Sequence, residues 1–105
     1  MGLDNGIILN TAESVPEQLD FPEEVEICYW RKDWELRNRI MDKCGFDEDD
    51  ACGEYTLTIE NINTIISILQ ELSPLHFSKD IESLKWLVKY ITNNPDAEAI
   101  FYDSY

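Results

Sequence analysis

The part of the chain that organises the fold is residues 24–45, which read EVEICYWRKDWELRNRIMDKCG. Apolar side chains occupy alternate positions from Val25 to Tyr29, the period of two that is typical of a half-buried β-strand. From Trp30 the apolar spacing changes to three and four, which predicts a helix. Gly45 fits the left-handed position that follows many helices. The buried stripe of this helix would hold Trp30, Trp34, Leu36, Arg37, Ile40, Met41 and Cys44.

Outward from this junction, the same two periods predict the other elements. Strands are expected at 6–10, 54–59 and 97–102, each an alternating or short apolar run between turn-forming residues. Helices are expected over 62–72, stopped by Ser73-Pro74, and from Ser78, which would act as the N-cap, to the Asn93-Asn94-Pro95 sequence. Residues 11–24 contain two prolines and little periodicity, and we expect an exposed loop there.

These elements predict one small α+β domain over residues 1–105. We expect a mixed or antiparallel sheet of about four short strands, with three helices packed on one face. Alternation within the strands indicates that the second face of the sheet is partly solvated.

The charge is uneven along the chain, whose net charge is −14. Residues 1–30 carry seven acids and no base, and residues 44–78 carry another seven acids and no lysine or arginine. Five of the eight lysines and arginines lie in residues 31–43. So acidic a protein repels nucleic acid and anionic lipid and attracts basic surfaces. We therefore expect no direct nucleic-acid binding and no membrane binding.

The three cysteines, Cys28, Cys44 and Cys52, have no CxxC spacing, and an odd number without a signal peptide favours free thiols in the cytoplasm. The sequence has no run of about 18 apolar residues that would span a membrane. A calcium loop starting at Asp47 would need glycine where Cys52 stands and glutamate where Thr58 stands. We expect no metal and no cofactor.

Catalytic signatures are also absent from the sequence. No Gly-x-Ser-x-Gly, HExxH, P-loop or dinucleotide-binding pattern is present, and the one histidine, His76, has no evident catalytic partner. An enzyme is the less favoured class, although the sequence leaves it open.

Four separated motifs together resemble a family of small, uncharacterised proteins found in phages, prophages and bacteria. Members typically start MGLD, carry YWRK at a strand-to-helix junction, then an Asp-rich CGEY segment, and finish with a Tyr-Asp-rich tail. The matching residues here are Met1-Gly2-Leu3-Asp4, Tyr29-Trp30-Arg31-Lys32, Cys52-Gly53-Glu54-Tyr55 and Tyr102-Asp103-Ser104-Tyr105. The resemblance implies a phage or mobile-element protein in the cytoplasm of a bacterial host. It supplies no reaction, and the helix after YWRK departs from the family pattern at Leu36-Arg37 and Arg39-Ile40.

The basic junction has two interpretations. In the first, Arg31 and Lys32 bind an anionic group beside Trp30 or Trp34. In the second, Arg31 pairs with chain acids such as Asp4 or Asp103 and links the two chain ends. The motif residues that either interpretation involves are Asp4, Tyr29, Trp30, Arg31, Lys32, Tyr55, Tyr102 and Asp103.

The leading functional hypothesis is a non-enzymatic accessory protein that acts by protein–protein contact. Its acidic surface would imitate nucleic acid and inhibit a basic host protein such as a nuclease or a CRISPR effector. The predicted contact residues are Glu13, Glu17, Asp20, Glu23, Glu24, Asp47, Glu48, Asp49, Asp50 and Glu54. One alternative is a small anionic-ligand module or minor enzyme that uses Arg31 and Lys32. Another is a homo-oligomeric phage structural protein, with an apolar patch around Trp86 and Tyr90.

Overall fold

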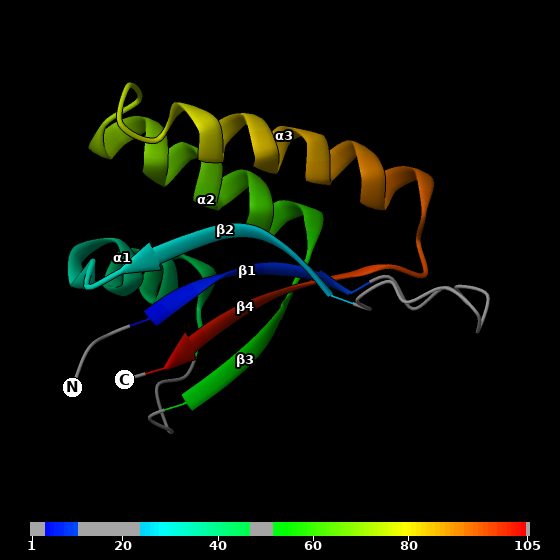
Figure 1. The fold of residues 1–105 in the computed structure, drawn as a ribbon, viewed down its shortest axis with the longest axis horizontal. Coiled ribbons are helices and arrows are strands. Elements are labelled where there is room, and N and C mark those ends of the chain that lie inside the picture. Colours follow the sequence, from blue (N-terminus) through cyan, green and yellow to red (C-terminus); the bar gives the residue numbers. More distant parts are fainter. Residues whose placement is uncertain (1–3, 11–23, 47–51, 105) are drawn as a thin grey trace.

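The computed structural model describes residues 4–10, 24–46 and 52–104. In these residues the four strands form one antiparallel sheet, and the three helices lie together on one face of it (Figure 1). The predicted α+β class, with helices on one face of a small sheet, is confirmed. The elements in chain order are β1 (Asp4–Asn10), β2 (Glu24–Arg31), α1 (Trp34–Cys44), β3 (Cys52–Leu57), α2 (Ile59–Leu72), α3 (Ser78–Asn93) and β4 (Glu98–Ser104).

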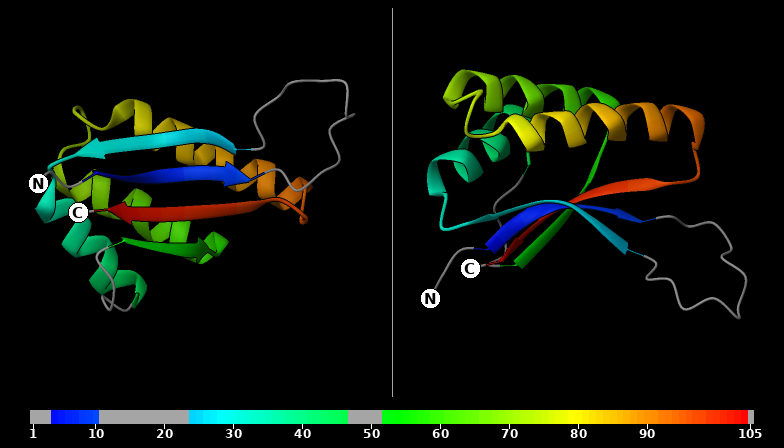
Figure 2. Two further views of the ribbon diagram at one scale, coloured as in Figure 1. Left: turned by 60° about the horizontal axis from the view of Figure 1, so that its bottom comes forward. Right: turned by 45° about the horizontal axis from the view of Figure 1, so that its top comes forward.

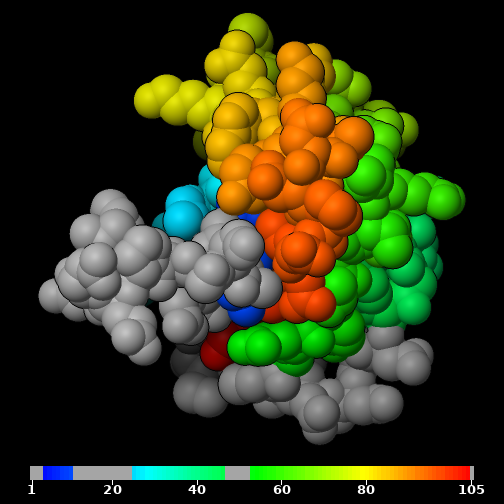
Figure 3. Space-filling model, turned by 90° about the vertical axis from the view of Figure 1, so that its right-hand side faces the viewer, coloured from blue at the N-terminus to red at the C-terminus, as the bar shows by residue number. Residues whose placement is uncertain are grey.

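The sheet order β2-β1-β4-β3 puts β1 and β4 side by side in the centre of the sheet. Asp4 lies opposite Ser104 and Asn10 opposite Glu98, so the two strands pair along their whole length. The described residues nearest the two chain ends therefore meet at one end of the sheet (Figure 2). Figure 3, which looks at the molecule from the opposite end, shows α2 and α3 (green through yellow to orange) as a layer on one side of the sheet.

A β-bulge interrupts β2 at Ile27. Ile7 lies opposite Cys28, but the next residue, Ile8, lies opposite Glu26. Ile27 is therefore an extra residue on β2. Such an insertion reverses which face of the sheet the following side chains occupy.

The bulge corrects the predicted faces of this strand. Cys28 and Trp30 are buried under the helices, while Tyr29 is 47% exposed on the other face. The sequence pattern had placed Tyr29 on the same face as Val25 and Ile27. An unbroken period of two assigns side chains to the wrong face of the sheet beyond an extra residue in the strand.

Helix α1 begins at Trp34, four residues later than the apolar spacing predicts. Trp30 belongs to β2, and Lys32 has a left-handed φ of 60°, which turns the chain between strand and helix. Asp33 is the N-cap, and its carboxylate accepts a hydrogen bond from the Leu36 amide at 3.2 Å. The prediction joined two elements because aromatic residues on either side of the turn happen to have helical spacing.

Capping residues define the ends of the next elements. Gly45 has a φ of 72°, as expected for the residue after a helix. Thr58 and Asn61 form a reciprocal capping box, so α2 begins at Ile59 and β3 ends at Leu57. The predicted strand therefore extended too far, because Ile59 continues the alternation of β3 but belongs to the helix.

Helix α3 has no side-chain cap, contrary to the prediction for Ser78. Phe77 occupies the N-cap position without a capping hydrogen bond, and its side chain is buried. Packing of Phe77 against the core thus defines the start of a helix that we expected a serine hydroxyl to define.

The hydrophobic core lies between the inner face of the sheet and the helices. Each fully buried aliphatic or aromatic side chain contributes about 1.5–3 kcal/mol. No helix in the described residues is long and apolar enough to cross a bilayer. The completely buried core side chains include Ile7, Leu9, Leu36, Ile40, Ile62, Ile65, Leu69, Leu84, Leu87 and Phe101.

Candidate functional site

The acidic residues predicted to contact a partner lie mostly outside the described part of the chain. Glu54 is exposed on β3, and Glu24 lies on β2 with only its backbone described. The residues that fall outside the description are Glu13, Glu17, Asp20, Glu23, Asp47, Glu48, Asp49 and Asp50.

The four sequence motifs meet in three adjacent rows across one end of the sheet. Each row takes one residue from each strand, in the sheet order β2, β1, β4, β3. The motifs converge because the strands next to the chain ends are the two central ones. The rows are Arg31–Asp4–Ser104–Cys52, Trp30–Asn5–Asp103–Gly53 and Tyr29–Gly6–Tyr102–Glu54.

The middle row faces the helices and contains a buried ion pair. Arg37 on α1 donates from Nε and Nη2 to Oδ2 of Asp103, at 3.0 and 2.9 Å. Arg37 is 1% exposed and Asp103 is 2% exposed. The Arg37 guanidinium also donates to Oδ1 of Asn38 at 3.0 Å and lies 5.9 Å from the centre of the Trp34 ring. The second interpretation of the sequence offered Asp103, with Asp4, as a partner of Arg31, whereas the partner of Asp103 is Arg37.

Asn5 lies beside this ion pair, directly opposite Asp103 across the β1–β4 pairing. Its side chain is fully buried, and neither its Oδ1 nor its Nδ2 has a hydrogen-bond partner. Oδ1 of Asp103 is likewise buried without a partner. The middle row therefore places polar side chains within an apolar core, and its ion pair links α1 to β4.

Trp30 completes the middle row and is buried, as predicted, although it lies on a strand and not on the predicted helix. Its indole Nε1 donates to Oδ2 of Asp80 on α3 at 3.1 Å. The Tyr55 ring lies over Gly53 on the same face and stacks on Phe46, with ring centres 4.7 Å apart. These two aromatic residues are thus parts of the packing between sheet and helices.

Arg31 and Lys32 are both exposed at the end of β2. Arg31 lies opposite Asp4, and neither base forms an ion pair within the described residues. Asp4 instead accepts a hydrogen bond from the Tyr29 hydroxyl at 2.8 Å.

Two tyrosine–carboxylate pairs occupy the face of the sheet that the helices leave open. Beside the Tyr29–Asp4 pair, the Tyr102 hydroxyl donates to Oε2 of Glu26 at 3.4 Å. Tyr102 can lean across β1 because the residue opposite it is Gly6, and a Cβ at Gly6 would lie 2.9 Å from the Tyr102 hydroxyl oxygen. Gly6 thus provides the space for this ring.

The surroundings of both tyrosines raise the pKa of their hydroxyls. The hydrogen bond to Asp4 is the main cause that raises the pKa of Tyr29. Burial, followed by the charge of Glu26, raises the pKa of Tyr102 from 10.0 to about 12. Because the folded state holds this proton more tightly, the free energy of unfolding falls as the pH rises from 10 to about 12, and the contribution is complete below pH 10.

Spectrophotometric titration is expected to show that Tyr102 ionises near pH 12. In a Glu26→Gln variant the pKa of this tyrosine should fall, but stay above 10, because burial is the larger cause. A Tyr102→Phe variant assigns the signal. If that variant keeps the same late-ionising tyrosine, the environment described for Tyr102 is wrong.

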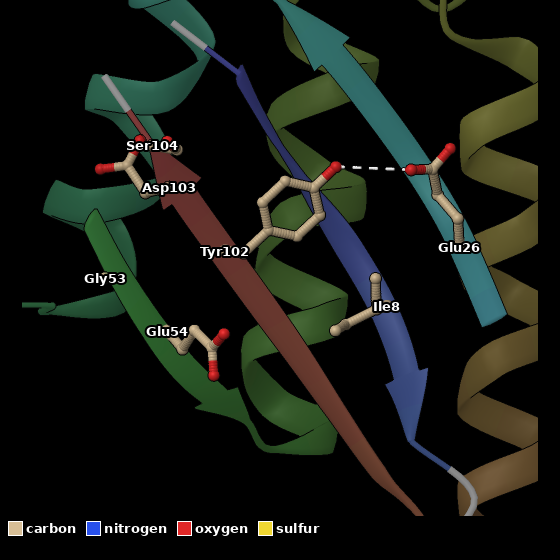
Figure 4. Close-up of a pocket in the computed structure, with 7 residues that line it drawn as sticks. All are labelled: Ile8, Glu26, Gly53, Glu54, Tyr102, Asp103 and Ser104. Atoms are coloured by element: carbon tan, nitrogen blue, oxygen red, sulfur yellow. Dashed lines mark hydrogen bonds between the residues drawn. The ribbon is translucent and has the colours of Figure 1, made fainter. Parts of the chain in front are cut away.

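A hollow of about 510 Å³ lies beside Tyr102 on the open face (Figure 4). The Tyr102 ring leans toward β2 and Glu26, while Glu54 stands on the opposite side, on β3. Glu54 has no hydrogen-bond or ion-pair partner among the described residues. The lining residues are Ile8, Glu26, Gly53, Glu54, Tyr102, Asp103 and Ser104.

The open face of the sheet is acidic, whereas the three helices carry acids and bases in equal numbers, six of each. Every strand contributes an acid to the open face or its rim, and the described ones are Asp4, Glu26, Glu54 and Glu98. Arg31 is the one base on the strands. The other seven lie on the helices or at the β2–α1 junction and are Lys32, Arg37, Arg39, Lys43, Lys79, Lys85 and Lys89.

The two described thiols are poor candidates for nucleophiles, because reactivity requires a thiolate. Burial raises the pKa of Cys44 to about 11, and burial together with the charge of Asp80 raises that of Cys28 further. His76 is exposed and contacts Phe77 edge-on. Within the described residues, no group of three or more His, Cys, Asp or Glu side chains is arranged to hold a metal ion.

Comparison with known proteins adds no identification: no family model, no curated protein and no solved structure matches this chain.

The sequence pattern did not identify several residues of this site. Gly6, Ile8 and Glu26 gave no signal, because their roles depend on which strands become neighbours. Arg37 did give one, since a charged residue inside an apolar helical stripe indicates a buried partner. Asn5 lies in the residues just before the predicted first strand, which begins two residues later than β1.

Proposed function

We propose that the protein acts by binding a basic protein surface through the open face of its sheet. The observation that carries this proposal is the uneven charge of the two layers: all four strands carry carboxylates and only one base, whereas the helices carry six acids and six bases. Long-range attraction between such a face and a basic partner accelerates association and weakens as salt is added. The exposed Tyr29 and the half-buried Tyr102 add the amphipathic contact area that interfaces favour.

The resemblance to phage and prophage proteins supports a more specific version of this proposal. In a bacterial cytoplasm, basic protein grooves belong chiefly to nucleic-acid-binding proteins. The acidic face would occupy such a groove in a host nuclease or CRISPR effector and thereby inhibit it. No catalytic step is part of the proposal.

This function is tested by capture from bacterial lysate at low and high salt. We expect the immobilised protein to retain a basic, nucleic-acid-binding protein at low salt and to release it at high salt. A Glu26→Gln/Glu54→Gln variant should bind that protein about tenfold more weakly, which corresponds to roughly 1.4 kcal/mol. The matched control is Glu60→Gln/Glu71→Gln on α2, which removes the same charge from the helical layer.

Two results would contradict the proposal. One is the absence of any basic protein at either salt concentration. The other is an equal loss of binding in both double variants, because overall charge would then explain capture without the sheet face.

A homo-oligomeric structural protein remains the second candidate. Trp86 on α3 is 50% exposed and stacks on Tyr90, with ring centres 5.1 Å apart. An exposed aromatic pair of this kind suits an interface. Native mass measurement separates this candidate from the first one, because it requires a mass above that of one chain.

The anionic-ligand alternative has less support. Arg31 faces Asp4 across the sheet and Lys32 precedes Asp33, so an acid neighbours each base. The tyrosine hydroxyls near them already donate their protons to carboxylates.

A further inference from the structure

The hollow beside Tyr102 is asymmetric, and Gly6 is the cause. On β4, Tyr102 lies between Gly6 of β1 on one side and Glu54 of β3 on the other. The ring leans over the glycine toward Glu26 of β2, which leaves open space between the ring and Glu54 (Figure 4). A guest side chain that enters this space would meet the ring of Tyr102 on one side and a carboxylate on the other.

The polar groups that face this space are mainly hydrogen-bond acceptors. The hydroxyl of Tyr102 has one proton, which it donates to Glu26, so its oxygen is left as an acceptor. Glu54 offers two more acceptor oxygens and has no partner in the described residues. A guest that fits this chemistry carries positive charge and donates several hydrogen bonds.

The flat ring and the carboxylate of the hollow favour an arginine over a lysine side chain. A guanidinium group is planar, donates through five N–H bonds, and stacks on an aromatic face while it pairs with a carboxylate. An ammonium group is compact and more strongly hydrated, so it gains less from a flat ring. Ile8 lines the same hollow and can cover the aliphatic part of a long side chain.

We infer that the hollow between Tyr102 and Glu54 receives an arginine side chain of the basic partner. This inference rests on the proposed function, because it names the group through which the open face recognises its partner. The guanidinium lies against the Tyr102 ring and donates to Glu54. Arginine is also the common side chain of proteins that bind phosphate groups, which agrees with a nucleic-acid-binding partner.

The experiment compares two synthetic peptides of equal length and charge, one containing four arginines and the other four lysines. Each is titrated into the isotope-labelled protein at low salt and followed by NMR. We expect the arginine peptide to bind at least tenfold more tightly and to shift the backbone signals of Ile8, Gly53 and Tyr102. A Tyr102→Leu variant should lose the preference for arginine. A Glu54→Gln variant should weaken arginine binding severalfold, whereas Glu71→Gln on α2 should leave it unchanged.

The outcomes separate this inference from the proposed function. If both peptides bind with equal affinity and release at high salt, the open face attracts bases but has no arginine site, and only the inference is overturned. Shifts confined to the helices, or equal effects of Glu54→Gln and Glu71→Gln, also overturn it. If neither peptide binds, the inference fails, and the lysate capture alone decides the proposed function. Should Tyr102→Leu fail to fold, Glu54→Gln still provides the test, because Glu54 is exposed and unpaired among the described residues.

Discussion

Replacing Asp103 by alanine is expected to lower the free energy of unfolding by about 3–5 kcal/mol. The reason is that Arg37, only 1% exposed, would keep its charge in the core without the carboxylate that compensates it. Small domains have a total stability of about 5–15 kcal/mol, so this change removes a large part of it. Urea denaturation followed by circular dichroism measures the loss.

Two control variants show whether the buried charge is the cause. Arg39 pairs with Glu35 on the surface of the same helix at 3.3 Å, and Arg39→Leu should cost no more than about 1 kcal/mol. A double variant, Arg37→Met/Asp103→Leu, removes both charges and should lose much less stability than Asp103→Ala. If Asp103→Ala costs no more than Arg39→Leu, the Arg37–Asp103 pair is not buried in solution.

Replacing Gly6 by alanine is expected to cost about 3 kcal/mol, at the upper end of what overpacking usually costs. The added Cβ would collide with the backbone carbonyl oxygen of Cys28 on β2 and approach the Tyr102 hydroxyl. A backbone atom within a sheet cannot move aside as a flexible side chain can. The change should also displace the Tyr102 ring, which NMR signals of that ring would report.

Gly45 provides the comparison for this prediction. It has a φ of 72°, and a Cβ there would meet no atom within 4 Å. Gly45→Ala should therefore cost only the backbone strain of a left-handed residue, about 1–2 kcal/mol. Equal stability of Gly6→Ala and the unchanged protein would show that β1 and β2 do not approach at Gly6 as described.

Much of the fold could be predicted from local pattern. The periods of two and three to four identified four strands and three helices in the right order, and Gly45 marked the end of α1. The errors occurred where a pattern continued past an element boundary. Trp30 extended the helical spacing backward into β2, and Ile59 extended the strand alternation forward into α2.

The candidate site was predictable only in part. The motifs at both chain ends, at the β2–α1 junction and on β3 were recognised, but not the rows that they form. One interpretation of the sequence offered Asp4 or Asp103 as a partner of Arg31, whereas Asp103 pairs with Arg37. A bulge of one residue at Ile27 decides this, because it sends Trp30 into the core and leaves Arg31 on the open face.

The sequence by itself determined the acidic composition, the number and order of the helices and strands, and the segments in which the bases lie. These properties depend on side-chain type and on neighbours three or four residues away. The tertiary structure alone decided which face each charge occupies and which acid meets which base. It did so because β1 and β4 pair in the centre of the sheet, although Asp4 and the residue opposite it, Ser104, are 100 residues apart in the chain. A long-range pairing of this kind leaves no periodic signal in the chain, yet it builds the acidic face, the Tyr102 hollow and the buried Arg37–Asp103 pair.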